Sequence, residues 1–454
     1  MTRSGVAPVR HLGRGALVAV GLNSVIGGGI FILPATVAAL AGATSLFAYA
    51  AAAAIVFGIG TTLARLATRH ETSGGPYAYV EAAFGPFAGF QVGWLFCLAR
   101  LTALANLLNG AALYLGALWP VLARPLPRAL LILACAALVT AILLSGIRRT
   151  ATTAELLALA KVLPLVALGV LGLFLVDPAR LQPAPVEPLS FARAVLLLIY
   201  AFTGFEILTV PAEESLDPRR DMPSALRLTL AAVCAIYVLV HVAALGALVN
   251  LGGEQAPLAA LAARLAGEPA RVGMTLIASV SMAGCGLASL LGASRMLYAL
   301  SAAGRIPAVL GALEQRRRTP ALAALLVAAC AVVLAISGSY VYLAALSSGS
   351  RLLIYLACCL AALVRAPGAA TAPAAGPTEA PAALPAAAPL RVTVPARARR
   401  VLVPLLTAAA IGVLLLVLEP REVVSGMIGV GAGVGLYLLA RLGRRGLNTQ
   451  EAAS

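Results

Sequence analysis

Apolar segments long enough to cross a lipid bilayer recur along the whole chain. An α-helix needs roughly 18 to 25 residues to span about 30 Å of hydrocarbon. The alternating pattern of a membrane β-barrel is absent from these segments. The sequence therefore predicts an all-α integral membrane protein. The twelve expected spans are Gly15–Leu40, Ser45–Leu66, Gly89–Leu118, Ala129–Ile147, Thr153–Val176, Ala192–Pro211, Leu226–Val249, Val272–Leu300, Leu322–Ser337, Val341–Val364, Val401–Leu418 and Val423–Ala440.

The overall composition agrees with lipid as the solvent. Of the 454 residues, 61% are hydrophobic and 11% are charged, and the mean hydropathy is +0.98. One soluble core could not bury that much apolar surface. The seven cysteines all fall within expected spans, where they act as small hydrophobic residues and predict no disulfides. The first apolar run lacks a cleavage signature, so we expect it to be retained as the first helix.

The basic residues are distributed unevenly between the two sides of the membrane. The net charge is +16, and Lys161 is the only lysine among 33 basic residues. With twelve spans, 23 arginines lie on one side and seven on the other, while Arg100 and Arg351 lie within spans. Arginine in short loops marks the cytoplasmic side. We therefore expect both termini in the cytoplasm, a location in the plasma (inner) membrane of a bacterium-like cell, and no nucleic-acid partner.

The spacing of the spans predicts an internal repeat. Five helices cross the membrane an odd number of times, so a second copy of such a unit is inserted upside down. The expected organisation is a cytoplasmic N-terminus (1–14), a five-helix repeat (15–176), its inverted copy (192–364), an Ala/Pro-rich cytoplasmic linker (366–397), helices eleven and twelve (398–441) and a cytoplasmic tail (442–454).

The first span of each half carries residues that disfavour a continuous helix. Span one contains three consecutive glycines, Gly27 to Gly29, and span six contains Gly204 between Thr203 and Glu206. Each glycine costs about 1 kcal/mol of helix stability relative to alanine. Close packing of small residues between helices is one interpretation. Breaks at equivalent repeat positions favour another, in which unwound backbone lines a binding cavity.

Two such breaks would present opposite charges to one ligand. The N–H groups that start the outer half of span one favour a carboxylate. The carbonyl oxygens of Tyr200, Ala201 and Thr203, left without partners by unwinding of span six, would suit an ammonium group. An α-amino acid is the simplest small molecule that carries both charges so close together.

Three runs of the sequence resemble a known family. These are GLNSVIGGGIFILP, ETSGGPYAYVEAAFGPFAGFQVGW and YAFTGFEILTVPAEESLDPRRDMPSAL. They are similar to those of the amino acid-polyamine-organocation permeases, which share the leucine-transporter fold, and the resemblance covers roughly residues 10 to 365. It implies a transporter with discontinuous first and sixth helices.

The resemblance also implies roles for individual residues. The substrate carboxylate would be bound by the backbone of Ile26, Gly27, Gly28 and Gly29, and the amine by Tyr200, Ala201, Phe202 and Thr203, with the Phe202 ring covering the substrate. The common family motif has Ser or Ala at the second glycine. Gly28 keeps the backbone role but supplies no hydroxyl, which leaves substrate preference less defined.

Ionisable residues within the spans are the candidates for coupling. Lysine can lose its proton when buried, whereas arginine cannot. In proton-coupled members of the family a fifth-span lysine takes the place of a cation, and Lys161 stands at that position, although a lysine reaching toward the interface would also fit. Glu206 is a candidate gate or proton relay, or else a partner of an intramembrane arginine; Arg100 and Arg351 must face protein or water.

Enzymatic signatures are absent from the sequence. It contains no H-E-x-x-H, no G-x-S-x-G and no P-loop, and it has three histidines. We therefore expect no enzyme activity, no cofactor and no metal site. The predicted function is proton-coupled amino acid uptake by alternating access, with H⁺, the amino acid and the lipid bilayer as partners. An exchanger or exporter of amino acids or amines, a nutrient sensor and a channel remain alternatives.

Overall fold

The computed structural model describes residues 14–67, 75–145, 161–209, 218–314, 319–364 and 396–451. Within these ranges every element of regular secondary structure is helical. The α-helices are α1 (Arg14–Val25), α2 (Gly29–Ala41), α3 (Ser45–Ala67), α4 (Pro76–Phe84), α5 (Pro86–Leu118), α6 (Pro125–Leu144), α8 (Pro188–Phe202), α9 (Pro218–Ala247), α10 (Pro257–Ala302), α11 (Ala321–Ser337), α12 (Tyr340–Leu363), α13 (Ala396–Leu415) and α14 (Pro420–Glu451). A further apolar helix covers Lys161–Leu175.

Length and hydropathy identify the segments that can cross a membrane. Among the described residues, seven stretches are long and apolar enough: Gly29–Ala67, Pro86–Leu118, Pro125–Leu144, Arg220–Ala247, Pro257–Ala302, Tyr340–Leu363 and Pro420–Arg441. Four shorter apolar helices join them: Lys161–Leu175, Pro188–Phe202, Ala321–Ser337 and Arg400–Leu415. The chain is therefore an all-helical integral membrane protein.

Three features of the helices differ from the expectation. The loop expected between the second and third spans contains α4, which begins with Pro76 after Gly75 (φ 56°) and ends at Gly85 (φ 85°). Helix α10 begins well before the expected span and is kinked at Gly267 (φ 74°). Helix α14 continues to Glu451, into the expected tail. Hydropathy missed these parts because they are short or polar.

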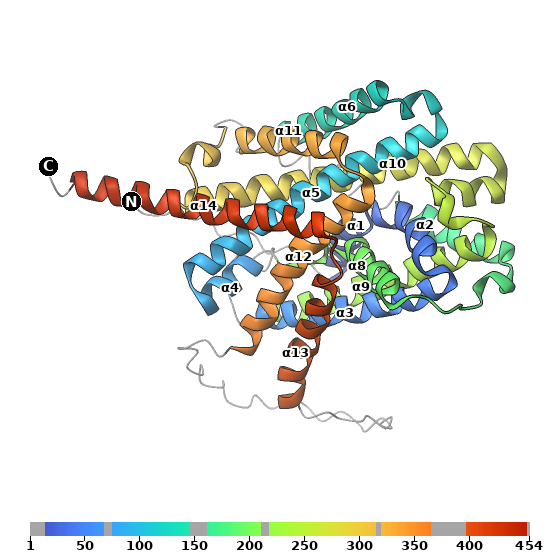
Figure 1. Ribbon diagram of the computed structural model, residues 1–454, viewed down its shortest axis with the longest axis horizontal. Helices are drawn as coiled ribbons and strands as arrows, with labels where there is room; N and C mark the ends of the chain where they lie inside the picture. Colours follow the sequence, from blue (N-terminus) through green and yellow to red (C-terminus); the bar gives the residue numbers. More distant parts are fainter. Residues whose placement is uncertain are drawn as a thin grey trace.

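The expected linker at 366–397 lies outside the described residues except for its last two, which belong to α13. Helix α13 packs on α3 and α12, while α14 packs on α5 and α12. Helix α14 extends beyond the bundle in Figure 1. Only 6% of the most apolar stretch of α14, within Pro420–Arg441, is buried inside the protein. Most of this apolar surface is therefore left to contact lipid.

Helix α8 lies in the interior of the bundle. Every residue from Arg193 to Phe202 is buried, and α8 contacts α2, α3, α12 and α13. An apolar surface on all sides is what a helix surrounded by protein requires. Helices α5, α6, α10 and α11 run side by side along the opposite part of the molecule (Figure 1). Both α5 and α10 contribute residues to the two main buried clusters and so join these two parts.

An ion pair fastens α8 to the start of α14. Arg193 is buried, and its Nη1 atom donates to Oε2 of Glu422 at 2.6 Å. Its Nη2 atom lies 3.3 Å from Oε1 of Glu419. Nothing in the sequence marks Arg193 as buried, because it lies at the edge of an expected span, where arginine normally reaches water.

Candidate functional site

The first expected span is interrupted at its glycines. Helix α1 ends at Val25, residues Ile26 to Gly28 are not helical, and α2 begins at Gly29. The predicted break is therefore present, but it is one residue shorter than expected. No side chain caps the start of α2. The first N–H groups of a helix have no partner within it, and the positive end of its dipole lies there.

Gly29 allows the two broken segments to approach closely. A Cβ atom at this position would lie 2.6 Å from Cα of Ala201 in α8, a backbone atom that cannot move aside. Alanine is therefore excluded here without a shift of one helix. The predicted run of glycines thus serves helix packing at Gly29 and an unwound backbone at Gly27 and Gly28.

The second break follows α8. Thr203 and Gly204 form a turn, and a 3₁₀ helix, η5 (Phe205–Thr209), continues the chain. Gly204 has φ of +117°, a region that side chains disfavour. Its carbonyl oxygen accepts a hydrogen bond of 2.9 Å from Oγ of Ser24, near the end of α1. The two interruptions are therefore in direct contact.

Two of the three carbonyl groups predicted to lack partners, those of Tyr200 and Ala201, have partners in the structure. The carbonyl oxygen of Tyr200 accepts from N and from Oγ1 of Thr203, at 3.2 and 2.7 Å. That of Ala201 accepts from Oη of Tyr237 at 3.0 Å. A nearby threonine and a tyrosine from another helix supply the donors that unwinding of the helix removes. A carbonyl has two lone pairs, so Ala201 retains one acceptor position.

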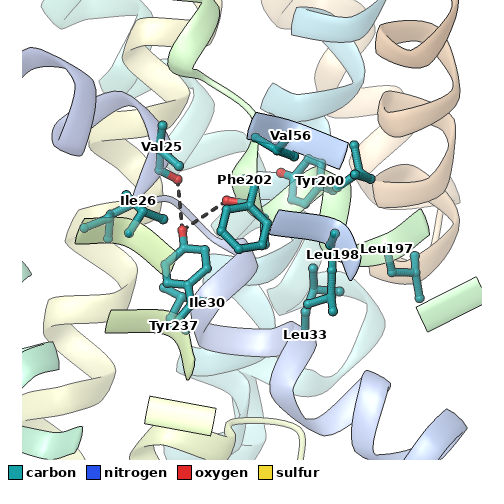
Figure 2. Close-up of a cluster of buried hydrophobic side chains, with 14 of the residues drawn as sticks. Val25, Ile26, Ile30, Leu33, Val56, Leu197, Leu198, Tyr200, Phe202 and Tyr237 are labelled. Atoms are coloured by element: carbon teal, nitrogen blue, oxygen red, sulfur yellow. Dashed lines mark hydrogen bonds between the residues drawn. The ribbon is translucent and has the colours of Figure 1, made fainter. Parts of the chain in front are cut away.

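Tyr237 of α9 holds the two breaks together. Its hydroxyl lies 3.1 Å from the carbonyl oxygen of Val25 (Figure 2). It lies 3.0 Å from the carbonyl oxygen of Ala201. Its ring packs against Phe202 with centroids 5.3 Å apart. The side chain is fully buried. One hydroxyl thus binds the last residue of α1 and the end of α8.

Replacing Tyr237 by phenylalanine is expected to lower the stability of the protein. The change would remove the single hydroxyl donor that two buried carbonyl oxygens share, and a buried acceptor left without its donor costs about 1–3 kcal/mol. Thermal unfolding of the purified protein in detergent should show a reduced midpoint. Tyr298→Phe is the matched control, because that side chain is 37% exposed. Equal midpoints for Tyr237→Phe and the parent would contradict the bridging role.

A small cavity of about 30 Å³ lies between the breaks. Its lining residues are Ser24, Val25, Gly27, Gly28, Gly29, Arg100, Ala103, Leu107, Tyr200, Ala201, Thr203, Gly204, Cys285, Ala288, Ser289 and Arg351. They come from both breaks and from α5, α10 and α12. This volume holds about one water molecule, whereas small-molecule pockets are about 300 Å³ or larger. An organic ligand therefore requires the surrounding helices to move apart.

Six of the eight predicted binding residues line this cavity, namely Gly27, Gly28, Gly29, Tyr200, Ala201 and Thr203. Ile26 and Phe202 do not line it. The Phe202 ring is buried against Tyr237 in this conformation, whereas the prediction made it the cover of the substrate. Tyr200 is the aromatic residue at the cavity, and its ring meets that of Tyr340 edge-on at 6.4 Å.

Lys161, in the helix Lys161–Leu175, contacts the C-terminal end of α1. Only 2% of the residue is exposed. Its Nζ atom donates to the carbonyl oxygens of Asn23 and Ile26, at 2.7 and 2.6 Å, and lies 3.5 Å from Sγ of Cys285. An ammonium group is favourable at a helix C-terminus, where carbonyl groups lack partners. The lysine therefore does not reach toward the interface, and it contacts the break directly.

Glu206 is paired with both intramembrane arginines. Its Oε1 atom lies 3.4 Å from Nη2 of Arg100 and 3.6 Å from Nε of Arg351. Its Oε2 atom accepts from N of Gly204 at 2.8 Å and from Oη of Tyr355 at 3.1 Å. Glu206 is therefore a partner of the arginines, one of the two interpretations offered by the sequence.

Several residues at the site were not predicted. Cys285 and Ser289 of α10 line the cavity, and Ser24 and Tyr237 bind backbone across the breaks. Nothing in the sequence distinguishes Cys285 from the other cysteines in apolar spans. Ser24 could have been found, since it is a polar residue three positions before the start of the glycine run at Gly27. Within the described ranges, no group of three or more His, Cys, Asp or Glu side chains could hold a metal ion.

Comparison with known proteins places the chain in a family. Residues 12–366 match the family model described as amino acid permease. An uncharacterized transporter of Mycobacterium tuberculosis is 33% identical over 332 residues, which cover 72% of this chain and 73% of the relative. The branched-chain amino acid permease BcaP of Bacillus subtilis is 26% identical over 69% of this chain and 72% of its own. The serine/threonine exchanger SteT of the same organism is 27% identical over 63% and 67%.

The protein is therefore an integral membrane transporter and not an enzyme. The chain belongs to the amino acid permease family of the amino acid-polyamine-organocation superfamily. The resemblance found in the sequence is confirmed.

Proposed function

We propose that this protein takes up amino acids together with protons, and that the cavity between the two breaks is the substrate site. The observation that carries the proposal is the meeting of two helix ends at one cavity. The uncapped start of α2 and the end of α8 both line it. A carboxylate and an ammonium group separated by one carbon atom match those two ends.

The substrate carboxylate would accept hydrogen bonds from backbone N–H groups near Gly28 and Gly29. Their position at the N-terminus of α2 adds the favourable end of a helix dipole. The ammonium group would donate to the carbonyl oxygens of Ala201 and Thr203 at the far side of the cavity. Ala201 keeps one acceptor position beside Tyr237, as described above. Tyr200 would contact the substrate side chain.

Lys161 would carry the coupled proton. Its charged form donates to the carbonyl oxygens of Asn23 and Ile26, whereas its neutral form has fewer donors and weaker contacts with them. Protonation therefore favours the conformation in which α1 ends against Lys161. A ligand, here a proton, shifts a conformational equilibrium by its difference in affinity for the two states.

Alternating access would follow from an inverted repeat. We propose twelve spans, ten of them in two five-helix halves (15–176 and 192–364), with helices eleven and twelve outside the repeat. Both termini would lie in the cytoplasm of a bacterium-like cell, with the protein in its plasma (inner) membrane. Rocking of α1, α2 and α8 against α5 and α10 would open the cavity alternately to each side.

Uptake into proteoliposomes tests this function. Purified protein should accumulate one or more radiolabelled amino acids when an inward pH gradient is imposed, and a sodium gradient should have no effect. A protonophore should abolish the accumulation. Accumulation driven by sodium at equal pH would contradict proton coupling, while failure to accumulate or exchange any amino acid would contradict the function as a whole.

Amino acid exchange is the second candidate, because one relative is named a serine/threonine exchanger. An exchanger moves labelled substrate only when unlabelled substrate is present on the opposite side. Liposomes loaded with amino acid would then take up label, and liposomes loaded with buffer would not. Net uptake into buffer-loaded liposomes distinguishes the proposed symport from exchange.

A further inference from the structure

We propose that the substrate carries a second carboxylate, so that the protein prefers acidic amino acids such as aspartate or glutamate. This inference rests on the proposed function, since it assumes that an amino acid binds in the cavity between the breaks. It names the class of the amino acid. The observation behind it is an excess of positive charge among the buried side chains at one side of that cavity.

Arg100 of α5 and Arg351 of α12 both line the cavity. Each is 4% exposed. Among the described residues, the carboxylate that faces them belongs to Glu206, so these three side chains together carry one net positive charge. Lys161 adds a second positive charge at the end of α1. An uncompensated charge in a buried site is unfavourable, and an anionic ligand removes that cost.

Glu206 cannot satisfy both guanidinium groups. It lies 3.4 Å from Arg100 and 3.6 Å from Arg351, longer than the roughly 2.7–2.9 Å of a charge-assisted hydrogen bond. Its second oxygen is already occupied by Gly204 N and Tyr355 Oη. One carboxylate shared in this way pairs only loosely with each arginine.

The unsatisfied donor is identifiable on Arg100. Its Nε atom is buried and has no hydrogen-bond partner among the described residues. The guanidinium lies over the Phe96 ring, 5.0 Å from its centroid. Arg351 donates from Nη1 to Oγ1 of Thr203, itself a lining residue. A carboxylate entering the cavity would therefore meet the guanidinium of Arg100 and a second one bonded to Thr203 at the α8 break.

The cavity thus has two separate features that bind anions. The start of α2 offers backbone N–H groups, and the arginine pair offers side-chain donors. A neutral amino acid has a single carboxylate and would leave one feature unused. An acidic amino acid has two carboxylates and one ammonium group, which matches both features and the carbonyl groups of the α8 end. The relatives named for branched-chain amino acids and for serine and threonine carry neutral substrates by name, so this preference would distinguish the present chain.

A comparison of acidic amino acids with their amides as ligands tests the proposal. L-Aspartate and L-asparagine, or L-glutamate and L-glutamine, have nearly the same shape and differ in one charge. We expect the acid to stabilise the purified protein against heat at concentrations at least about tenfold lower than the amide, because buried charge pairs of this kind contribute several kcal/mol. The same order should hold in uptake by proteoliposomes.

Variants at Arg100 connect the preference to the arginine pair. Arg100→Met leaves Arg351 balanced by Glu206, so the acid should lose its advantage over the amide while amide binding persists. Arg100→Lys retains the charge and should retain most of the preference. Arg421→Met removes a positive charge from a side chain that is 64% exposed, and it should behave as the parent. If Arg100→Met does not fold, the comparison of acid and amide on the parent protein still tests the preference.

Other outcomes would overturn the proposal in distinguishable ways. Uptake of neutral amino acids without competition from aspartate or glutamate would refute the acid preference and leave the proposed function intact. Neutral uptake that requires chloride, with that requirement lost in Arg100→Met, would assign the arginine pair to an inorganic anion. Absence of uptake or exchange for every amino acid, acids included, would refute the proposed function together with this inference.

Discussion

Replacing Lys161 by alanine is expected to reduce uptake driven by a pH gradient to the background of empty liposomes. The ammonium group binds the carbonyl oxygens of Asn23 and Ile26 at the end of α1, and alanine offers neither a donor nor a proton. Amino acid binding should survive, because the groups proposed to bind substrate belong to α2, α8 and their breaks. Thermal stabilisation by substrate measures binding, and accumulation under an inward pH gradient measures coupling.

Lys161→Arg is the decisive companion variant. Arginine keeps the charge and the hydrogen-bond donors, but it does not release its proton at accessible pH. It should therefore fail in uptake driven by a pH gradient as alanine does. Accumulation equal to that of the parent would reduce Lys161 to a fixed charge and leave the coupling without its residue.

Lys161 is the only lysine in the chain, so its side chain can be observed alone by NMR. Protein labelled with ¹⁵N at lysine gives a single side-chain ammonium signal. That signal should be protected from exchange with water in the conformation described here, where the residue is 2% exposed. Addition of substrate should change the protection if the cavity opens and closes as proposed. Unchanged exchange across all substrate conditions would contradict movement at this end of α1.

Replacing Gly28 by leucine is expected to abolish both binding and transport while the protein still inserts and folds. A Cβ atom at Gly28 would lie 3.0 Å from Cδ2 of Leu107 and 3.3 Å from Oη of Tyr340. The remaining atoms of leucine would then occupy a cavity of only about 30 Å³. The neighbours are side chains, which can move more easily than backbone.

The matched control for this substitution is Gly273→Leu. Gly273 lies in α10, and a Cβ atom there meets nothing within 4 Å. That variant should bind and transport as the parent does, with a similar yield of folded protein. Retained substrate-dependent thermal stabilisation in Gly28→Leu would place the binding site elsewhere.

The sequence predicted the helical class and the positions of both breaks, because these follow from local properties. Hydropathy over about 20 residues identifies a span, and consecutive glycines reveal where a helix is weak. Local sequence therefore defines which backbone is unwound. Lys161 was singled out through the family resemblance, and its contact with the carbonyl oxygens of Asn23 and Ile26 comes from the structure.

Contacts between distant helices could not be predicted in the same way. Tyr237 satisfies the carbonyl oxygen of Ala201, 36 positions away in the chain. The ring of Phe202 packs against Tyr237 and away from the cavity. Arg193 forms an ion pair with Glu422, which is 229 positions away in the chain. Such partners depend on how helices pack, and a single sequence without relatives carries no record of that packing.

A structure of the protein with a bound amino acid would locate the substrate site. We expect the ligand between the two breaks, with its α-carboxylate within hydrogen-bond distance of backbone N–H groups near Gly28 and Gly29. The α-ammonium should lie at the carbonyl oxygens of Ala201 and Thr203. An amino acid bound outside this cavity, or one whose carboxylate and ammonium contact neither break, would contradict the account.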